Sequence, residues 1–237
     1  MAASDGTRPV SVEQNDGVHP LELLIDAPDT ASSVFVFAHG AGAGMKHRFM
    51  QTVASLLAAR SIAVIRFNFR YMTAGRSYPD RPPELYKAVD AAIGYARTRF
   101  PSLPVIAGGK SMGGRVTADA IATGAAPKVD GLVFFGYPLH APGKPSTQRA
   151  HLLESLNIPM LFLQGSRDKL ADPTLLGPIV ESLPKASMHL VEEGDHSFAV
   201  PKRSGRSTQE VLEDLADIVS AWVARLKMRR KTQPNDP

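Results

Sequence analysis

The chain has 237 residues, 43% of them hydrophobic, and carries a formal net charge of +4 at pH 7. This length suits one sizeable α/β domain or two small ones, and is enough for a full hydrophobic core. The absence of cysteine excludes disulfides and thiolate metal sites. No apolar run approaches the roughly 20 residues of a membrane span and the N-terminus has no apolar signal core, so we expect a cytoplasmic protein without membrane contact.

Much of the excess positive charge lies in the last predicted helix and the tail, where a basic cluster suits the negative end of a helix dipole. We therefore predict no nucleic-acid partner. Residues 1–8 and the basic tail 229–237 are predicted to be disordered, which leaves 9–228 as a single domain without internal repeats.

Taken in order, the chain opens with two predicted strands, 10–13 and 21–25. They flank a turn signal at 15–17 and predict a leading hairpin. Residues 34–38 are apolar on both faces, as in a strand buried between layers of helices.

A glycine-dense loop, His39-Gly40-Ala41-Gly42-Ala43-Gly44-Met45, follows that strand. It is not a dinucleotide fingerprint, because Met45 stands where the third glycine would be. Such a loop can turn a backbone N–H toward a developing oxyanion, and Ala41 is our first choice of donor, with Gly42 the second. We expect His39 to brace the loop rather than act as a base.

A helix over 50–59 and a buried strand over 62–67 come next. The following segment, 68–81, is polar and predicted to be irregular, and Pro82-Pro83 then starts a helix at its first turn. Within the irregular segment we expect four exposed side chains at the border of a cleft, namely Arg70, Tyr71, Arg76 and Tyr78.

The central motif is Gly109-Lys110-Ser111-Met112-Gly113, between an apolar strand and the small-residue start of a helix. A serine in this pattern sits on a sharp, strained turn, with glycines where side chains would collide with neighbouring elements. The Met112 N–H then points to where an attacked carbonyl oxygen would become negative. A phosphate-binding loop is disfavoured because Pro104 replaces the first glycine of that motif.

The rest of the chain continues to alternate, and its Val-, Ile- and Phe-rich strands indicate a mostly parallel sheet with the site at the strands' carboxyl ends. The segment 137–157 has room for a proline-rich loop and one short helix at 148–156, but not for a helical cap. We therefore expect an open, shallow cleft. The remaining elements are predicted at 131–136, 158–164, 174–183, 187–191 and 208–227.

Two polar residues each lie just past the end of a predicted strand, Asp168 and His196. A serine hydroxyl needs an imidazole to take its proton, and the imidazole needs a carboxylate to fix its tautomer. The order Ser111, Asp168, His196 is that of the α/β-hydrolases.

Other residues could fill these roles. Asp172 and Asp195 are alternative acids, but Asp172 is better placed to cap the next helix and Asp195 to pair with a loop N–H. His140 is the rival base, although it lies in the proline-rich loop and before the acid in sequence.

The His39-Gly40 loop, the Ser111 motif, Gly165-x-x-Asp168 and Gly194-Asp195-His196-Ser197 together resemble a serine hydrolase of the α/β-hydrolase fold. More closely, residues 20–225 resemble the small predicted bacterial hydrolases allied to dienelactone hydrolase. The resemblance to dienelactone hydrolase would imply a cysteine nucleophile, whereas this chain has Ser111 and no cysteine. The closer resemblance is carried by Phe69-Arg70-Tyr71-Met72, Tyr137-Pro138-Leu139-His140-x-Pro142-Gly143-Lys144-Pro145 and Lys202-Arg203-Ser204-Gly205.

This resemblance implies a mostly parallel sheet flanked by helices, without a cap domain. It also implies cleavage of a small ester, thioester or activated acyl substrate through an acyl-enzyme on Ser111. We expect no metal and no cofactor, a small-molecule partner, and a monomer or homodimer. The alternative is a non-catalytic binding or scaffold module, because the group shares its fold with a scaffold-type subunit of an animal histone acetyltransferase complex. The residues expected around the cleft are Gly42, Arg70, Tyr71 and His140.

Overall fold

The computed structural model describes residues 8–12 and 20–232, with side chains described as far as residue 228. Its strands are β1 (Arg8–Val12), β2 (Leu21–Asp26), β3 (Ser33–Ala38), β4 (Ile62–Phe67), β5 (Val105–Lys110), β6 (Gly131–Phe135), β7 (Met160–Gly165) and β8 (Ala186–Val191). Its α-helices are α1 (Arg48–Ala58), α2 (Arg70–Thr73), α3 (Pro82–Arg99), α4 (Met112–Ala122), α5 (Pro173–Ser182) and α6 (Thr208–Thr232). The 3₁₀ turns are η1 (Gln148–Ala150), η2 (Leu153–Ser155) and η3 (Lys202–Ser204).

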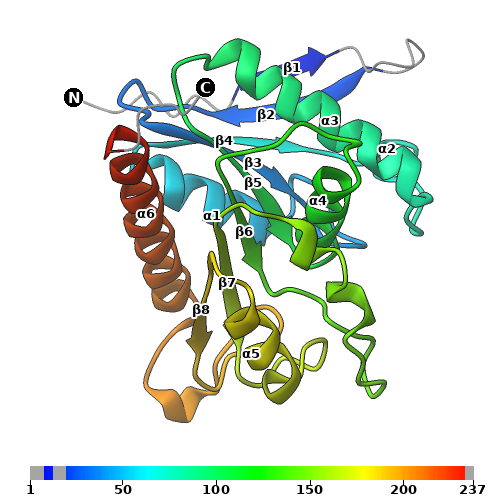
Figure 1. Ribbon diagram of the computed structural model, residues 1–237, viewed down its shortest axis with the longest axis vertical. Helices are drawn as coiled ribbons and strands as arrows, with labels where there is room; N and C mark the ends of the chain where they lie inside the picture. The colour runs from blue at the N-terminus through cyan, green and yellow to red at the C-terminus, as the bar shows by residue number, and fades with distance from the viewer. Residues whose placement is uncertain (1–7, 13–19, 233–237) are drawn as a thin grey trace.

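The strands form one eight-stranded sheet in the order β1-β2-β4-β3-β5-β6-β7-β8 (Figure 1). The pairs β1–β2 and β2–β4 are antiparallel, and every pair from β4 to β8 is parallel. The predicted mostly parallel sheet is therefore confirmed. Since the parallel strands all end at one edge, the loops that follow them are brought together there.

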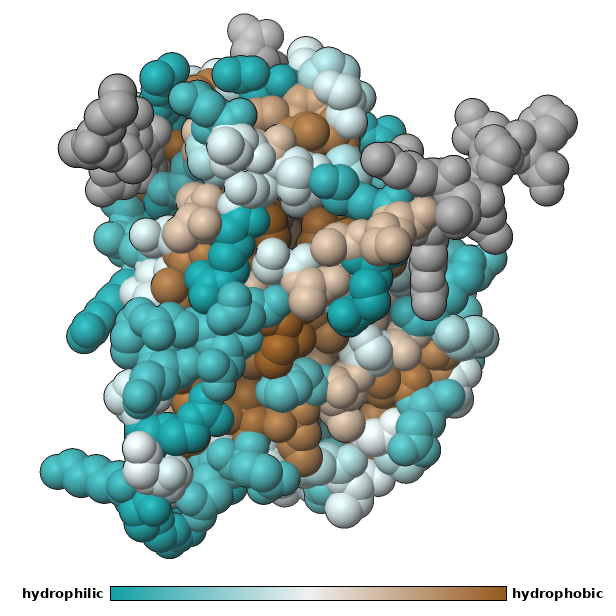
Figure 2. Space-filling model, turned by 90° about the vertical axis from the view of Figure 1, so that its left-hand side faces the viewer, coloured by the Kyte–Doolittle hydropathy of each residue, from teal (hydrophilic) through white to brown (hydrophobic). Residues whose placement is uncertain are grey.

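Helices cover both faces of this sheet (Figure 1). Along β3, Val34 and Val36 pack into the cluster under α3, α4 and α5, whereas Phe35 and Phe37 pack into the cluster under α1 and α6. A strand that is buried on both faces needs apolar side chains on both, which explains why polar and apolar residues do not alternate along β3. Seen from the side on which α6 lies, hydrophilic and hydrophobic side chains both reach the molecular surface (Figure 2).

Both ends of the predicted domain need correction. Arg8, expected in a disordered segment, begins β1, which pairs antiparallel with β2. The predicted turn at 15–17 and residues 1–7 lie outside the described residues. Helix α6 continues to Thr232, so the first four residues of the tail expected at 229–237 are helical, and 233–237 lie outside the described residues. Lys and Arg are good helix formers and favour a helix C-terminus, which explains the extension.

The connection from β6 to β7 contains no α-helix. The single helix predicted over 148–156 is instead two separate 3₁₀ turns, η1 and η2. Long-range hydrogen bonds replace helical ones here: the Tyr137 hydroxyl donates to the Arg149 carbonyl at 2.5 Å, and the Arg149 guanidinium to the Pro138 carbonyl at 3.2 Å. The expected absence of a helical cap from this connection is confirmed.

Two predicted helix starts are confirmed. Helix α3 begins at Pro82, whose missing N–H costs nothing in a first turn. Ahead of α6, the Glu210 carboxylate accepts the Ser207 N–H at 2.7 Å, and the Ser207 hydroxyl oxygen accepts the Glu210 N–H at 3.2 Å. This reciprocal pair is a capping box.

Candidate active site

Ser111 is the single residue between the end of β5 and the start of α4. Its backbone has φ 50° and ψ −121°, a conformation that L-residues rarely adopt. Its N–H donates to the Phe135 carbonyl at the end of β6, at 3.0 Å, which helps to hold the turn. The side chain is thereby presented at the carboxyl edge of the sheet, as the sequence motif predicts.

The glycines of the motif allow this turn to pack against the end of β3. A Cβ on Gly109 would lie 2.3 Å from the Ala38 carbonyl oxygen. A Cβ on Gly113 would lie 2.5 Å from the carbonyl oxygens of both Ala38 and His39. Any larger residue would therefore push the serine turn away from the loop that follows β3.

The structure brings Ser111, His196 and Asp168 into one hydrogen-bonded chain. The His196 Nε2 lies 2.8 Å from the Ser111 Oγ, and its Nδ1 lies 2.7 Å from the Asp168 Oδ2. The Asp168 side chain is fully buried, and that of His196 is 25% exposed. This is the arrangement in which imidazole takes a proton from a hydroxyl while a carboxylate orients the ring.

Asp168 is held by groups that sequence reasoning missed. The Leu170 N–H donates to its Oδ1 at 2.8 Å, and the Gln164 side-chain amide donates to its Oδ2. Gln164 is fully buried, and its own oxygen accepts the Tyr137 N–H at 2.9 Å. The sequence does offer a sign of this role: Gln164 is a glutamine in an otherwise apolar buried strand, and a buried amide requires hydrogen-bond partners.

The two alternative acids have other partners. Asp172 caps α5, where its Oδ1 accepts the Thr174 hydroxyl at 2.7 Å and the Thr174 N–H at 2.9 Å. These hydrogen bonds, the one from the hydroxyl first, hold the pKa of Asp172 below its ordinary value. The Asp195 carboxylate accepts the N–H groups of Ser197 and Ala199 at 2.7 and 2.9 Å. Asp168 is thus the carboxylate that reaches the imidazole.

A cavity of about 410 Å³ opens beside Ser111 and His196. Part of its wall comes from the loop after β3, through Gly40, Ala41, Ala43 and His47. The rest of the wall includes apolar side chains that were not expected there, Phe49 and Met50 of α1 and Leu170 of the loop after β7.

Two residues expected at the cleft lie elsewhere. The short helix α2 turns Tyr71 inward, where it is fully buried with its ring centroid 6.0 Å from that of His39. Burial raises the pKa of the Tyr71 phenol. Arg70 pairs with Glu84 of α3 at 3.6 Å. Neither residue lines the cavity beside Ser111.

His140 and Gly42 were also expected at the cleft. His140 is buried, where its Nε2 accepts the Asp172 N–H at 2.9 Å and its Nδ1 lies 2.9 Å from the Ala141 carbonyl. It therefore positions the start of α5 and does not line the cavity. Gly42 stands between two lining residues without lining the cavity itself.

The two expected oxyanion donors, the N–H groups of Met112 and Ala41, lie at the start of α4 and in the loop after β3. Met112 is the first residue of α4, so its N–H has no acceptor within the helix. Ala41 lines the cavity. A Cβ on Gly40 would lie 3.5 Å from the Ser111 Cβ, so the loop that carries Ala41 packs directly against the serine turn.

His39 braces that loop. Its Nε2 accepts the Phe69 N–H at 3.1 Å, so the proton is on Nδ1, which donates to the Gly40 carbonyl at 2.8 Å. Burial lowers the pKa of His39 to about 4, and the ring is therefore neutral at pH 7. Its two hydrogen bonds tie the loop after β3 to the loop after β4.

Lys110, the residue before the serine, has a place in the site that the sequence did not reveal. Its Nζ donates to the His196 carbonyl at 2.6 Å and lies 5.7 and 5.8 Å from the ring centroids of Phe49 and Phe198. Burial lowers the pKa of Lys110 to about 8, against the attraction of Asp168 and then Asp195. The lysine ties the loop that carries His196 to the end of β5.

No three His, Asp or Glu side chains in the described part of the chain are arranged to hold a metal ion. Over the same residues, no helix is both long and apolar enough to cross a membrane. The expectation that the protein uses no metal or cofactor stays a prediction.

A sequence model of the alpha/beta hydrolase domain family matches residues 31–224. Among solved structures, the chain is similar to an alpha-beta serine hydrolase homologue from Coxiella burnetii, with 19% identity over 88% of this chain and 95% of that one, and a TM-score of 0.70. It is also similar to a lid-less α/β serine hydrolase from Xanthomonas campestris (21%, 97% and 96%, 0.68). A dienelactone hydrolase from Anabaena variabilis is similar as well (19%, 92% and 96%, 0.71).

Proposed function

The chain belongs to the alpha/beta hydrolase domain family, and from that premise we propose that it is a serine hydrolase that cleaves a small ester, thioester or activated acyl substrate. The observation that carries the proposal is the hydrogen-bonded chain from the Ser111 Oγ through His196 to Asp168, with distances of 2.8 and 2.7 Å. A non-catalytic binding module would not require a strained serine hydrogen-bonded to a histidine and, through it, to a buried carboxylate, because backbone strain is costly.

In the proposed reaction, the Ser111 Oγ attacks the substrate carbonyl carbon while the His196 Nε2 takes the hydroxyl proton. The bond from that carbon to the leaving group then breaks, and His196 gives the proton to the leaving atom. Water repeats the sequence on the acyl-serine, which releases the acid and restores Ser111. Asp168 accepts the Nδ1–H of His196 throughout, which fixes the tautomer and stabilises the imidazolium.

The negative charge that develops on the carbonyl oxygen needs donors that are already in place. We assign this role to the N–H groups of Met112, at the start of α4, and of Ala41. The helix N-terminus adds a partial positive charge at the same point. The proposed chemistry uses a nucleophile, a base and an oxyanion site that all come from the chain, so the expected partner is a small acyl compound alone.

The test is labelling by a fluorophosphonate probe, which should modify Ser111 in the folded protein. Ser111→Ala should prevent labelling and lower turnover of p-nitrophenyl acetate by on the order of 10⁴ to 10⁶, because loss of the nucleophile removes the acyl-enzyme route. The melting temperature should change by only a few degrees.

The matched control is Ser182→Ala, which removes an exposed hydroxyl that donates to the Ile179 carbonyl in α5. It should keep both labelling and turnover. Retained turnover in Ser111→Ala, or absence of labelling in the folded wild-type protein, would overturn the proposed function.

A further inference from the structure

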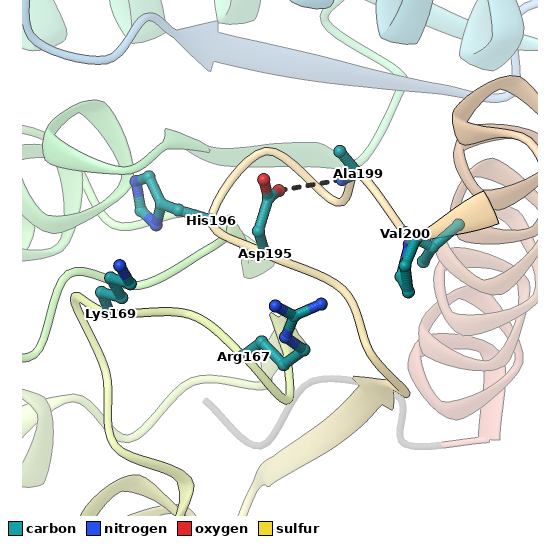
Figure 3. Close-up of a pocket in the computed structure, with 7 residues that line it drawn as sticks. Arg167, Lys169, Asp195, His196, Ala199 and Val200 are labelled. Carbon is teal, nitrogen blue, oxygen red and sulfur yellow. Dashed lines mark hydrogen bonds between the residues drawn. The ribbon is translucent and has the colours of Figure 1, made fainter. Parts of the chain in front are cut away.

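A second cavity, of about 510 Å³, also borders His196 (Figure 3). Its lining includes Arg167, Lys169 and Asp195, together with residues 199–201 of the loop that leads to η3. His196 lines both this cavity and the one beside Ser111. The two hollows therefore meet at His196, and the proposed reaction does not use the second one.

Two cations enter this cavity from the turn after β7. Arg167 and Lys169 flank Asp168 in the sequence. The Asp168 side chain is fully buried, whereas both flanking residues are exposed. Figure 3 shows the two basic side chains on one side of the cavity, with Asp195 and His196 across from them. The Arg167 N–H donates to the Gly194 carbonyl at 2.8 Å, which fastens this turn to the loop that carries His196.

The side chains of Arg167 and Lys169 form no hydrogen bond or ion pair with any residue that the structure describes. The Asp195 carboxylate, which also lines the cavity, already accepts two backbone N–H groups, from Ser197 and Ala199. Two unpaired positive charges beside a partly satisfied carboxylate leave the cavity suited to an anion.

The direction of proton transfer indicates which part of a substrate would enter this cavity. His196 must give its proton to the leaving atom, so the leaving group lies on the imidazole side of the attacked carbon. The acyl part then lies over the apolar wall of the first cavity, where Ala41, Phe49 and Met50 stand. The second cavity, which shares His196 with the first, is the one available to the leaving alcohol.

We propose that Arg167 and Lys169 form an anion subsite for the leaving alcohol, so that the substrate is an ester whose alcohol part carries a carboxylate or phosphate group. This assignment rests on the proposed function. An arginine fork binds the oxygens of either group in pairs, and the lysine adds a point charge beside it. The cations that the sequence placed nearer the cleft do not serve, since Arg70 pairs with Glu84 and Arg76 with Asp80.

The experiment compares three acetyl esters of closely similar phenols. These are meta-acetoxybenzoate, meta-acetoxyphenyl phosphate and the neutral methyl ester of meta-acetoxybenzoate. We expect kcat/KM to be higher for both anionic esters than for the neutral one, and the preference to fall as salt is added, because the two cations are exposed and screened by ions. The carboxylate and phosphate arms show which anion the subsite prefers.

The variant is Arg167→Gln combined with Lys169→Gln. It should lower the ratio of anionic to neutral kcat/KM by about tenfold, mainly through KM, because two exposed charges contribute to binding rather than to the chemical step. The matched control is Lys128→Gln, which removes an exposed charge ahead of β6, at the opposite edge of the sheet. It should leave the ratio unchanged.

The outcomes separate this proposal from the one on which it rests. If the wild-type protein hydrolyses all three esters without preferring the anions, or the double variant keeps the wild-type ratio, the anion subsite is wrong and the hydrolase assignment stands. If the wild-type protein hydrolyses none of the esters and Ser111 does not react with the fluorophosphonate, the proposed function itself fails.

Discussion

Lys110 shows how one side chain links the parts of the site. It directly precedes the strained Ser111, and its ammonium group holds the backbone carbonyl of His196. The two residues come from loops that follow different strands, β5 and β8. A buried cation is costly unless it is paired or hydrogen-bonded, and here the aromatic faces of Phe49 and Phe198 also stabilise it.

The burial of Lys110 predicts a pH dependence of stability. Its pKa is about 8 in the folded protein and 10.5 ordinarily, so between these pH values the unfolded chain binds more protons than the folded one. The contribution of this residue to the free energy of unfolding therefore rises with pH across that window. Lys110→Met removes the titration and with it this rise.

Urea unfolding of the wild-type protein and of Lys110→Met, at about pH 7 and about pH 10, measures the effect. The wild-type protein should gain stability relative to the variant at the higher pH. Lys128→Met, which removes an exposed lysine, controls for the general effect of charge. An unchanged difference between wild type and Lys110→Met at the two pH values would contradict the prediction.

Among the elements, β5 and α4 depend on close contact with the end of β3. Gly109 and Gly113 leave no space between the serine turn and the carbonyl groups of Ala38 and His39. The same approach places the loop after β3 beside Ser111, and so brings Ala41 to the cavity. The packing of these elements and the proposed oxyanion site therefore depend on the same contacts.

Gly113→Ala should accordingly destabilise the protein by about 2 kcal/mol or more, because a Cβ 2.5 Å from two carbonyl oxygens forces the backbone to move. Its matched control is Gly94→Ala in the middle of α3, where a Cβ would meet no atom within 4 Å. That variant should gain up to about 1 kcal/mol from helix propensity. Chemical denaturation of both variants tests the contrast. An unchanged midpoint for Gly113→Ala would show that the turn accommodates a Cβ at this position and would contradict the prediction.

At the scale of the whole molecule, the site lies open at the carboxyl edge of the sheet. The connection from β6 to β7 supplies only the 3₁₀ turns η1 and η2, so no helical cap stands over Ser111. The cavity beside the serine is about 410 Å³, with Phe49, Met50 and Leu170 as apolar wall. It offers a short apolar surface rather than a long channel.

This openness predicts a preference for short acyl chains. Each buried CH₂ adds about 0.8 kcal/mol of affinity, but only while there is apolar wall to bury it. Across p-nitrophenyl esters from acetate to dodecanoate, kcat/KM should peak between acetate and butyrate, with no increase when detergent micelles are added. A specificity constant that keeps rising to dodecanoate would require a buried acyl channel.

The sequence by itself determined the order and type of most elements and the residues of the proposed triad. Strands such as β3 and β4 are apolar on both faces, a signal that local composition carries without knowledge of the neighbours. Ser111, Asp168 and His196 could be selected because each follows a predicted strand, and the carboxyl ends of parallel strands meet at one edge. Their roles remain proposals.

Only the tertiary structure decided which side chains of the loops face the site. Tyr71 and His140 are polar residues in segments that local patterns predict to be irregular and at the surface. Packing nevertheless buries both of them, Tyr71 within the short helix α2. Lys110 holds the loop that carries His196, and Gln164 holds Tyr137 after β6, through contacts 86 and 27 residues away in sequence. Whether a loop side chain points inward depends on partners from other strands, and a one-dimensional pattern does not contain that information.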